Sequence, residues 1–518
     1  MNRLGGPTGA CRAAYNPAMS RSRLRTDGLE WIFFAAVGVV IAQGCGEVEA
    51  APGGSQTKVA EIYSNNCASC HGDALDNGNA PSLLDDQWLT DGSDRALYDA
   101  IWDGIEDLGM PAYAGALSEA EAWGLVVHIR EKAWDRAESQ RQPAEANDRG
   151  VFDSQHHRFT VETVAEGLDR PWALAFLPDG TLIFTERSGT LHLVEDGQVS
   201  EPIADTPEVW NFGQGGLLDV AVDPNFSENG WIYLSYSEKQ AEGGRDGAGM
   251  TAVVRGRLDR GRRAWIDQQE LFHADAEHAS ERGQHFGSRF VFEGDDILLF
   301  SIGDRGMQDR AQQLDRPNGK VHRIHTDGSI PKDNPFAPGS DGAKQHPEAL
   351  PTVWSWGHRN PQGLDRHPET GRVYDIEHGP RGGDEINLVE PLHNYGWPEV
   401  AYSINYNQLP FGHRAPWHEE AGFTEPVHYW IPSIAICGAH FYVGAGFPNW
   451  ENDLFVSALA KEQVHRVRFG DDGRSVVEEE VLFEGNGRVR DVIAGPDGSL
   501  YIATEQPGMI RKLVPAGD

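Results

Sequence analysis

Five consecutive residues, Cys67-Ala68-Ser69-Cys70-His71, carry the first recognisable chemistry of this chain. Two thiols at this spacing can each bond to a haem vinyl group, and the adjacent imidazole can then ligate the iron. A C-x-x-C pair by itself also suits a redox dithiol or half of a zinc site. The histidine that follows directly favours covalent haem attachment over both alternatives.

A candidate for the second axial position lies downstream. Met110 sits in Leu108-Gly109-Met110-Pro111, and a thioether on a loop bounded by Gly and Pro suits that role. Ser118 is then predicted to cap a helix that carries Trp123 and further apolar residues. Residues 55–137 resemble a class I cytochrome c. The resemblance implies a small all-α domain with haem c on Cys67 and Cys70, its iron held by His71 and Met110.

Length and charge limit the possible functions. At 518 residues the chain is too long for one ordinary domain. It has 79 acidic and 44 basic residues and a formal net charge of −35. Such a surface repels nucleic acid, so a nucleic-acid partner is excluded. Five scattered cysteines do not make a disulfide scaffold, and Cys437 has no evident partner.

Residues 1–50 are predicted to be an export signal. Arginines precede an apolar run from Trp31 to Ala42, which at about a dozen residues is short for a membrane span. Ile41-Ala42-Gln43-Gly44-Cys45 resembles a lipoprotein cleavage box, which would give membrane attachment through a lipidated Cys45. Cleavage after Ala50 and an uncleaved anchor helix stay open. The prediction is an exported, periplasmic protein, which the lipoprotein box would anchor to the membrane.

The remainder of the chain is predicted to be mainly β. After a linker at 138–155, residues 156–518 repeat a turn followed by a short β-rich run, about every sixty residues. Six such units favour a six-bladed β-propeller with long loops. The runs are Thr181–Thr185, Trp231–Ser235, Ile297–Ser301, Arg372–Ile376, Asp453–Ser457 and Ser499–Thr504.

The loops between these runs contain His285, Arg359, Arg488 and Arg490. A propeller brings the loops of every blade to one channel mouth, so residues far apart in sequence can converge there. Three guanidinium groups and an imidazole at such a mouth suit a planar, polyanionic ligand.

Residues 161–514 resemble the soluble glucose and aldose sugar dehydrogenases that depend on pyrroloquinoline quinone (PQQ). The motifs are Gly167-Leu-Asp-Arg-Pro-Trp172, Gly303-Asp-Arg-Gly306, Asp333-Asn-Pro-Phe336 and Asn394-Tyr-Gly-Trp-Pro398. The resemblance implies oxidation of an aldose at C1 to the lactone, with PQQ and Ca²⁺. Electrons would pass to the haem and then to a periplasmic cytochrome or copper protein.

The resemblance also assigns site residues. His285 matches the general base that takes the proton of the anomeric hydroxyl. The backbone carbonyls of Gly379 and Pro380 match ligands of the catalytic calcium, and Glu385 and Tyr395 match a second calcium site. The residues that match PQQ contacts are Gln214, Arg359, Asn360, Arg488 and Arg490.

This chain departs from the family pattern at three positions. The family's PQQ-contacting lysine falls near Ala460, so either Lys461 serves one position along or the contact is lost. Gln284 stands where relatives have Asp or Asn before the catalytic histidine. Cys437, where relatives often have Ser, lies near the expected substrate loop as a free thiol. Three aromatic residues suit either a sugar-stacking face or the core: Tyr429, Trp430 and Phe441.

Two other functions stay open from the sequence. One is a related quinoprotein acting on sorbosone, another aldehyde or an alcohol. The other is a non-catalytic, ligand-binding propeller with an independent electron-carrier cytochrome. If the two parts cooperate, the haem domain is expected to dock near the PQQ face, tethered by residues 135–153. The oligomeric state is not predicted.

Overall fold

The computed structural model describes residues 56–517, apart from 86, 142–143, 242–246 and 413. The predicted export signal at 1–50, with Cys45, therefore lies outside the described residues. Among the helices that are described, none is both long enough and apolar enough to cross a membrane.

The first part of the described chain is helical. Ser118 caps α4 as predicted, because its hydroxyl accepts the Glu121 amide while the Glu121 carboxylate accepts the Ser118 amide at 2.9 Å. The helix buries Trp123 and Ile129 and runs beyond residue 137. The elements are α1 (Val59–Asn66), α2 (Ala68–His71), α3 (Asp94–Asp103), η1 (Glu106–Leu108) and α4 (Glu119–Gln140).

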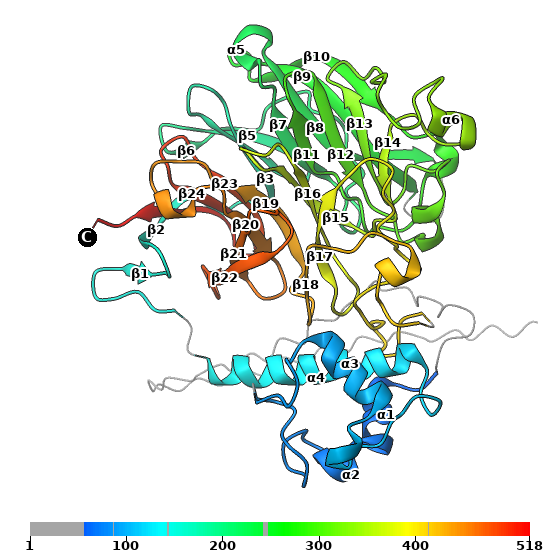
Figure 1. The fold of residues 1–518 in the computed structure, drawn as a ribbon. Coiled ribbons are helices and arrows are strands. Elements are labelled where there is room, and N and C mark those ends of the chain that lie inside the picture. The colour runs from blue at the N-terminus through cyan, green and yellow to red at the C-terminus, as the bar shows by residue number, and fades with distance from the viewer. Residues whose placement is uncertain (1–55, 86, 142–143, 242–246, 413, 518) are drawn as a thin grey trace, which may run out of the picture. The chain divides into compact units, whose positions relative to one another are not determined.

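Beyond α4, the described strands form six antiparallel sheets, the blades of a propeller (Figure 1). This confirms the predicted mainly β, six-bladed fold preceded by a small α-helical domain. The first three blades are β3 (Pro171–Phe176), β4 (Leu182–Glu186), β5 (Thr190–Glu195) and β6 (Gln198–Val199); β7 (Leu217–Val222), β8 (Trp231–Ala241), β9 (Ala248–Asp259) and β10 (Ala264–Phe272); and β11 (Phe290–Glu293), β12 (Ile297–Ile302), β13 (Lys320–His325) and β14 (Val353–Trp356).

The other three blades include the one that closes the ring. They are β15 (Pro361–Arg366), β16 (Val373–Glu377), β17 (Asp384–Val389) and β18 (His428–Trp430); β19 (Ile436–Phe441), β20 (Leu454–Ala458), β21 (Gln463–Phe469) and β22 (Val476–Leu482); and β23 (Val489–Ala494), β24 (Leu500–Glu505), β25 (Gly508–Pro515), β2 (Arg158–Glu166) and β1 (Val151–Asp153). Because β2 pairs with β25, the two ends of the propeller share one blade.

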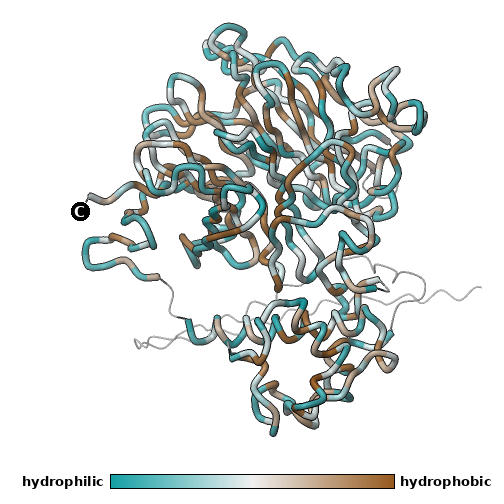
Figure 2. The backbone as a smooth tube through the Cα atoms, viewed as in Figure 1, coloured by the Kyte–Doolittle hydropathy of each residue, from teal (hydrophilic) through white to brown (hydrophobic). Residues whose placement is uncertain are grey.

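The first strand of each blade lies innermost. Each of these strands contacts the first strand of the next blade, and β23 contacts β3 to complete the ring. In an antiparallel sheet, the start of the first strand and the turn between the second and third strands lie at the same end. The loops predicted to carry the site therefore meet at one end of the ring. Figure 2 shows the apolar runs along the blade strands.

Short helical turns and long connections complete the fold. The connection between β17 and β18, residues 390–427, is long. Its Tyr402 and Ile404 belong to one apolar cluster with Val59 of α1 and Trp123 of α4. The short elements are α5 (Phe226–Asn229), α6 (Asp341–Gln345), η2 (Ala276–His278), η3 (Gln308–Gln312), η4 (Glu419–Ala421) and η5 (Pro448–Trp450).

Candidate functional site

The predicted arginines and histidine converge at one end of the propeller. His378 directly follows β16, and the pKa of its imidazole reflects how close these groups lie to it. Burial holds the pKa of its imidazole well below the usual value, and the positive charges of Arg359, Arg490 and Arg488 lower this pKa further. Residues that are separated by up to about two hundred positions in the chain therefore share one electrostatic environment.

Several arginines at this end of the propeller share the carboxylate of Glu505. Arg490 pairs with Glu505 at 2.5 Å, and Arg488 lies 3.7 Å from the same carboxylate. Arg187, in the turn between β4 and β5, joins the group, because Arg490 and Glu505 both perturb its pKa. Among the described residues, the buried Nε atoms of Arg187 and Arg359 have no hydrogen-bond partner. Orphaned cationic donors of this kind fit an anionic ligand with several acceptor oxygens, as PQQ is.

Sequence reasoning missed Arg187. Its signal was its position, two residues after the run Thr181–Thr185, in the same kind of turn that carries Gly379 and Pro380 in another blade.

His285 is buried and held in one orientation. Its Nδ1 lies 2.7 Å from Oδ1 of Asp304, while the Asp304 Oδ2 accepts the indole N–H of Trp397 at 2.9 Å. If Nδ1 donates to the carboxylate, Nε2 is left as the free base. Asp304 and Trp397 stood inside quoted motifs, Gly303-Asp-Arg-Gly306 and Asn394-Tyr-Gly-Trp-Pro398, but had no assigned role.

The backbone at His285 is strained, with φ of 56°. The Gln214 side chain supports it by accepting the His285 amide at 2.8 Å. Asn360 accepts the Gly287 amide at 3.3 Å. Both predicted PQQ-contacting amides therefore hold the loop of the base, and their contact with a cofactor stays a prediction.

Electrostatics keeps His285 in its neutral form. Burial and then Arg359 lower the pKa of its imidazole, and Asp304 only partly opposes this. Burial alone would raise the pKa of Asp304, but the contacts with His285 and Arg359 outweigh burial, so the pKa of this carboxyl is lowered. A neutral imidazole oriented by a carboxylate is suited to general-base catalysis.

A small cavity lies beside the arginines. It holds about 10 Å³ and is lined in part by Glu377, Gly379, Pro380, Glu385 and Tyr395. That is the room of one water molecule or ion. The four residues predicted for the two calcium ions therefore meet at one place.

The side chains around this cavity favour a cation. Glu377 and Glu385 stand directly opposite each other in the pairing of β16 with β17, where like charges repel. Burial, and then Glu377, raise the pKa of Glu385 well above its usual value. Nδ1 of His358 lies 3.1 Å from both Asp375 and Glu377, so a buried three-residue group could also hold a metal. Crowded carboxylates around an ion-sized space fit Ca²⁺, which prefers oxygen ligands.

The helical domain encloses a cavity of about 420 Å³, and Cys67, Cys70, His71 and Met110 all line it. Neither thiol is in a disulfide. Nδ1 of His71 lies 3.1 Å from the Pro81 carbonyl, so it can donate there and leave Nε2 for iron. The donor set and the apolar walls, which include Leu97, Ile101, Leu125 and Ile129, fit covalently bound haem.

The structure shows the surroundings of the three residues that depart from the family pattern. The Lys461 ammonium lies 5.3 Å from the ring centre of Trp134 in α4, and its PQQ contact stays a prediction. The backbone carbonyl of Gln284 accepts a hydrogen bond from the buried Arg305. Cys437 is buried, and burial raises the pKa of its thiol to about 11, so it stays protonated at neutral pH.

The three predicted sugar-stacking aromatics are engaged elsewhere. Trp430 and Phe441 are buried in the core of the propeller. Tyr429 stacks on Tyr402 with ring centres 4.0 Å apart and donates its hydroxyl to Asp94 of α3 at 2.9 Å. The structure therefore favours the packing role for all three.

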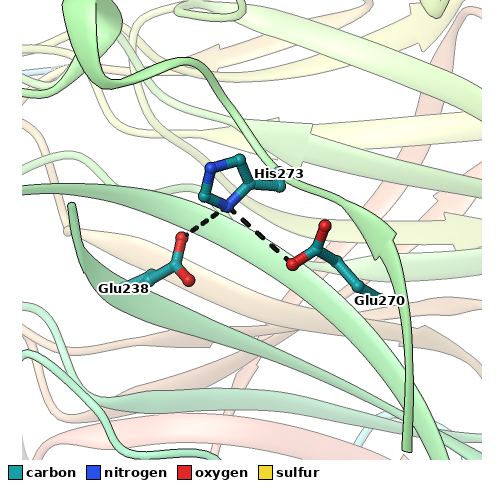
Figure 3. Close-up of side chains that lie close together, drawn as sticks. All are labelled: Glu238, Glu270 and His273. Atoms are coloured by element: carbon teal, nitrogen blue, oxygen red, sulfur yellow. Dashed lines mark ion pairs between the residues drawn. The ribbon is translucent and has the colours of Figure 1, made fainter.

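A second cluster of metal-ligand types lies on the surface of the second blade. Figure 3 shows Glu238, Glu270 and His273 there. His273 Nδ1 pairs with Glu238 at 2.8 Å and lies 4.0 Å from Glu270. This is the geometry of a solvent-exposed ion pair, and we assign no site to it.

Comparisons with known proteins agree with both parts of the fold. The family model described as glucose/sorbosone dehydrogenase matches residues 168–512, and the one described as cytochrome c oxidase, cbb3-type, subunit III matches residues 54–129. The aldose sugar dehydrogenase YliI of Escherichia coli is 40% identical over 359 residues, covering 68% of this chain and 92% of that protein. Quinoprotein glucose dehydrogenase B of Acinetobacter calcoaceticus is 28% identical over 429 residues, covering 68% and 87%.

Solved structures resemble the propeller as well. The apo form of the soluble aldose sugar dehydrogenase from Escherichia coli is 39% identical with a TM-score of 0.62, covering 69% of this chain and 100% of that one. The PQQ-bound aldose sugar dehydrogenase from Streptomyces coelicolor is 26% identical with a TM-score of 0.55, covering 69% and 98%.

Proposed function

The chain belongs to the glucose/sorbosone dehydrogenase family and adds a cytochrome c domain to its propeller, and we propose that it is a quinohaemoprotein sugar dehydrogenase. It oxidises an aldose at C1 to the lactone with PQQ and Ca²⁺, and the electrons leave through a covalently bound haem. The observation that carries the proposal is the neutral His285, held by Asp304 beside Arg359, whose buried Nε has no hydrogen-bond partner among the described residues.

Each residue of the propeller site has a defined task. His285 accepts the proton of the anomeric hydroxyl at Nε2, while Asp304 fixes the ring and stabilises the imidazolium that forms. Arg359, Arg488 and Arg490 would hold the carboxylates of the cofactor. When bound, PQQ supplies the hydride acceptor and Ca²⁺ the Lewis acid that polarises the reactive carbonyl.

The haem domain provides the outlet for electrons. His71 and Met110 would both ligate the haem iron, which would leave it no free position for substrate, so we assign substrate oxidation to the propeller. A periplasmic cytochrome or copper protein would accept the electrons one at a time. We also propose that the protein is exported to the periplasm, with Cys45 as its lipid attachment if the lipoprotein box is used.

A second substrate class has specific support. The matching family model names sorbosone beside glucose, so an aldehyde hydrate is the alternative substrate. Both substrates present a hydroxyl on the carbon that loses hydride, and the same base would serve either. The paired His285 and Asp304 favour an enzyme over a non-catalytic binding propeller.

A substrate panel on the PQQ- and Ca²⁺-loaded protein tests the proposal, with reduction followed at the haem absorbance. Aldoses should reduce the haem in the wild type. His285→Ala should lower this rate about 10²- to 10⁴-fold, the usual contribution of a general base, while PQQ stays bound. His346→Ala, on the surface, is the control and should behave as the wild type. Unchanged turnover in His285→Ala would exclude the base assignment, and aldehyde-dependent reduction alone would select the alternative substrate.

A further inference from the structure

Helix α4 contacts both candidate sites of the chain. Leu125 and Ile129 line the haem cavity. Glu131, two residues beyond Ile129, forms a two-pronged ion pair with Arg381 of the propeller, at 2.7 Å and 3.3 Å. The Glu131 side chain is only 12% exposed, and a carboxylate is rarely this buried without a dedicated partner.

Arg381 directly follows Gly379 and Pro380, whose carbonyls are the proposed calcium ligands. On the pocket side, Arg359 donates to the carbonyls of His378 at 2.9 Å and Gly379 at 3.1 Å. On the opposite side, the Arg381 side chain leaves the pocket for α4. The loop 378–383 is thus held by one arginine at each face.

The backbone of the rest of this loop is conformationally flexible by its sequence, so contacts with other segments must fix its conformation. Gly382 and Gly383 have φ of 112° and 64°, conformations that glycine adopts readily. The Arg381 amide donates to the Ser403 hydroxyl at 2.9 Å. Ser403 lies between Tyr402 and Ile404, which pack in the apolar cluster of α4. One outer support of the loop therefore ends on the haem domain, and the other ends on a propeller segment that packs against it.

We propose that Glu131 is a positioning residue for the propeller's metal site. Through Arg381, the haem domain holds the loop whose carbonyls bind the active-site calcium. The inference rests on the proposed function and adds a structural role for the haem domain beyond electron transfer. It also makes calcium binding depend on a residue that lies outside the propeller.

The expected effect follows from the contacts. Glu131→Gln removes the counter-ion of Arg381 and loosens the loop. Partners that orient metal ligands typically contribute about 10- to 100-fold to metal affinity, so Ca²⁺ binding should weaken by that order. Arg381→Gln should have the same effect. Both residues act through one contact. The double variant should therefore bind Ca²⁺ no more weakly than the single variant with the lower Ca²⁺ affinity.

The experiment uses full-length, haem-containing protein without substrate. Ca²⁺ affinity is measured from the Ca²⁺-dependent shift of the melting temperature, and PQQ affinity from its absorbance at fixed Ca²⁺. Glu138→Gln is the matched control, since Glu138 lies on the same helix in an exposed pair with Arg141. Arg381→Lys, which keeps the charge but loses the two-pronged geometry, is the milder variant and should give an intermediate affinity.

Wild-type Ca²⁺ affinity in Glu131→Gln and Arg381→Gln would overturn the proposal, even with a lowered melting temperature, because the pair would then be only structural. Strictly additive losses in the double variant would overturn it as well. If the wild type binds neither Ca²⁺ nor PQQ, the proposed function itself falls, and this result is distinct from the first two.

Discussion

Asp304 orients the proposed base His285 through one hydrogen bond. In Asp304→Asn, the ring loses the carboxylate that fixes it, and the turnover number should fall roughly 100-fold or more. The same carboxylate raises the pKa of His285. Its loss should therefore move the acidic limb of kcat/KM to lower pH, because the imidazole stays neutral further down.

The control for this variant is Asp296→Asn. Asp296 is exposed and lies 3.3 Å from His325 at the surface, so its pH profile should match the wild type. An acidic limb that moves to higher pH in Asp304→Asn would contradict the assigned electrostatics.

Met110 is the proposed second ligand of the haem iron. Its side chain lines the haem cavity together with His71. A Met axial ligand raises the potential of haem iron, so Met110→Ala should lower the midpoint potential within the roughly 0.8 V range that axial ligands span. The visible spectrum should change as well. Met307→Ala, in a propeller loop, is the control, and an unaltered spectrum in Met110→Ala would exclude it as a ligand.

Strands β16 and β17 place Glu377 and Glu385 on one small cavity, and Asp375 lies close to Glu377 in the buried group with His358. Burial and mutual repulsion raise the pKa of Asp375 and Glu385 in the folded protein. A carboxyl with a raised pKa in the folded protein loses its proton at a lower pH in the unfolded chain than in the folded one. The metal-free protein should therefore lose stability as the pH rises. Bound Ca²⁺ should reverse this loss.

Scanning calorimetry with Ca²⁺ or with a chelator checks the prediction. The gain in melting temperature on adding Ca²⁺ should be larger at about pH 8 than at about pH 6, because protons compete for the same oxygens. A hundredfold excess over Kd corresponds to roughly 3 kcal/mol. Glu385→Gln should reduce the gain, whereas an equal gain at both pH values would argue against a carboxylate site.

The elements were more predictable than their contacts. The run Ile297–Ser301 lies within β12, because a turn and a buried apolar stretch define a strand locally. The convergence of Arg359 and Arg490 follows from propeller topology. The local sequence pattern does not determine which side chains meet. The place of Arg187 in the site, the Trp397–Asp304 hydrogen bond and the Glu131–Arg381 ion pair all depend on tertiary packing. Tyr429 was ambiguous for the same reason, since its neighbours Tyr402 and Asp94 come from distant segments.

At the scale of the whole chain, the haem domain and the propeller share buried surface. Val59 and Trp123 of the helical part pack in one apolar cluster with Tyr402 and Ile404 of the 390–427 connection. The loop 378–383 adjoins this contact through Arg381. Electrons from substrate should therefore reach the haem of the same chain.

Stopped-flow reduction of the haem by substrate tests this. In the PQQ- and Ca²⁺-loaded protein, the observed rate should be first order and unchanged over about a tenfold range of enzyme concentration, because no encounter between molecules is needed. It should also be insensitive to salt, whereas transfer between two chains with a formal charge of −35 each would speed up as salt screens their repulsion. A rate proportional to enzyme concentration would mean that one molecule reduces the haem of another, and the buried contact would then have only a structural role.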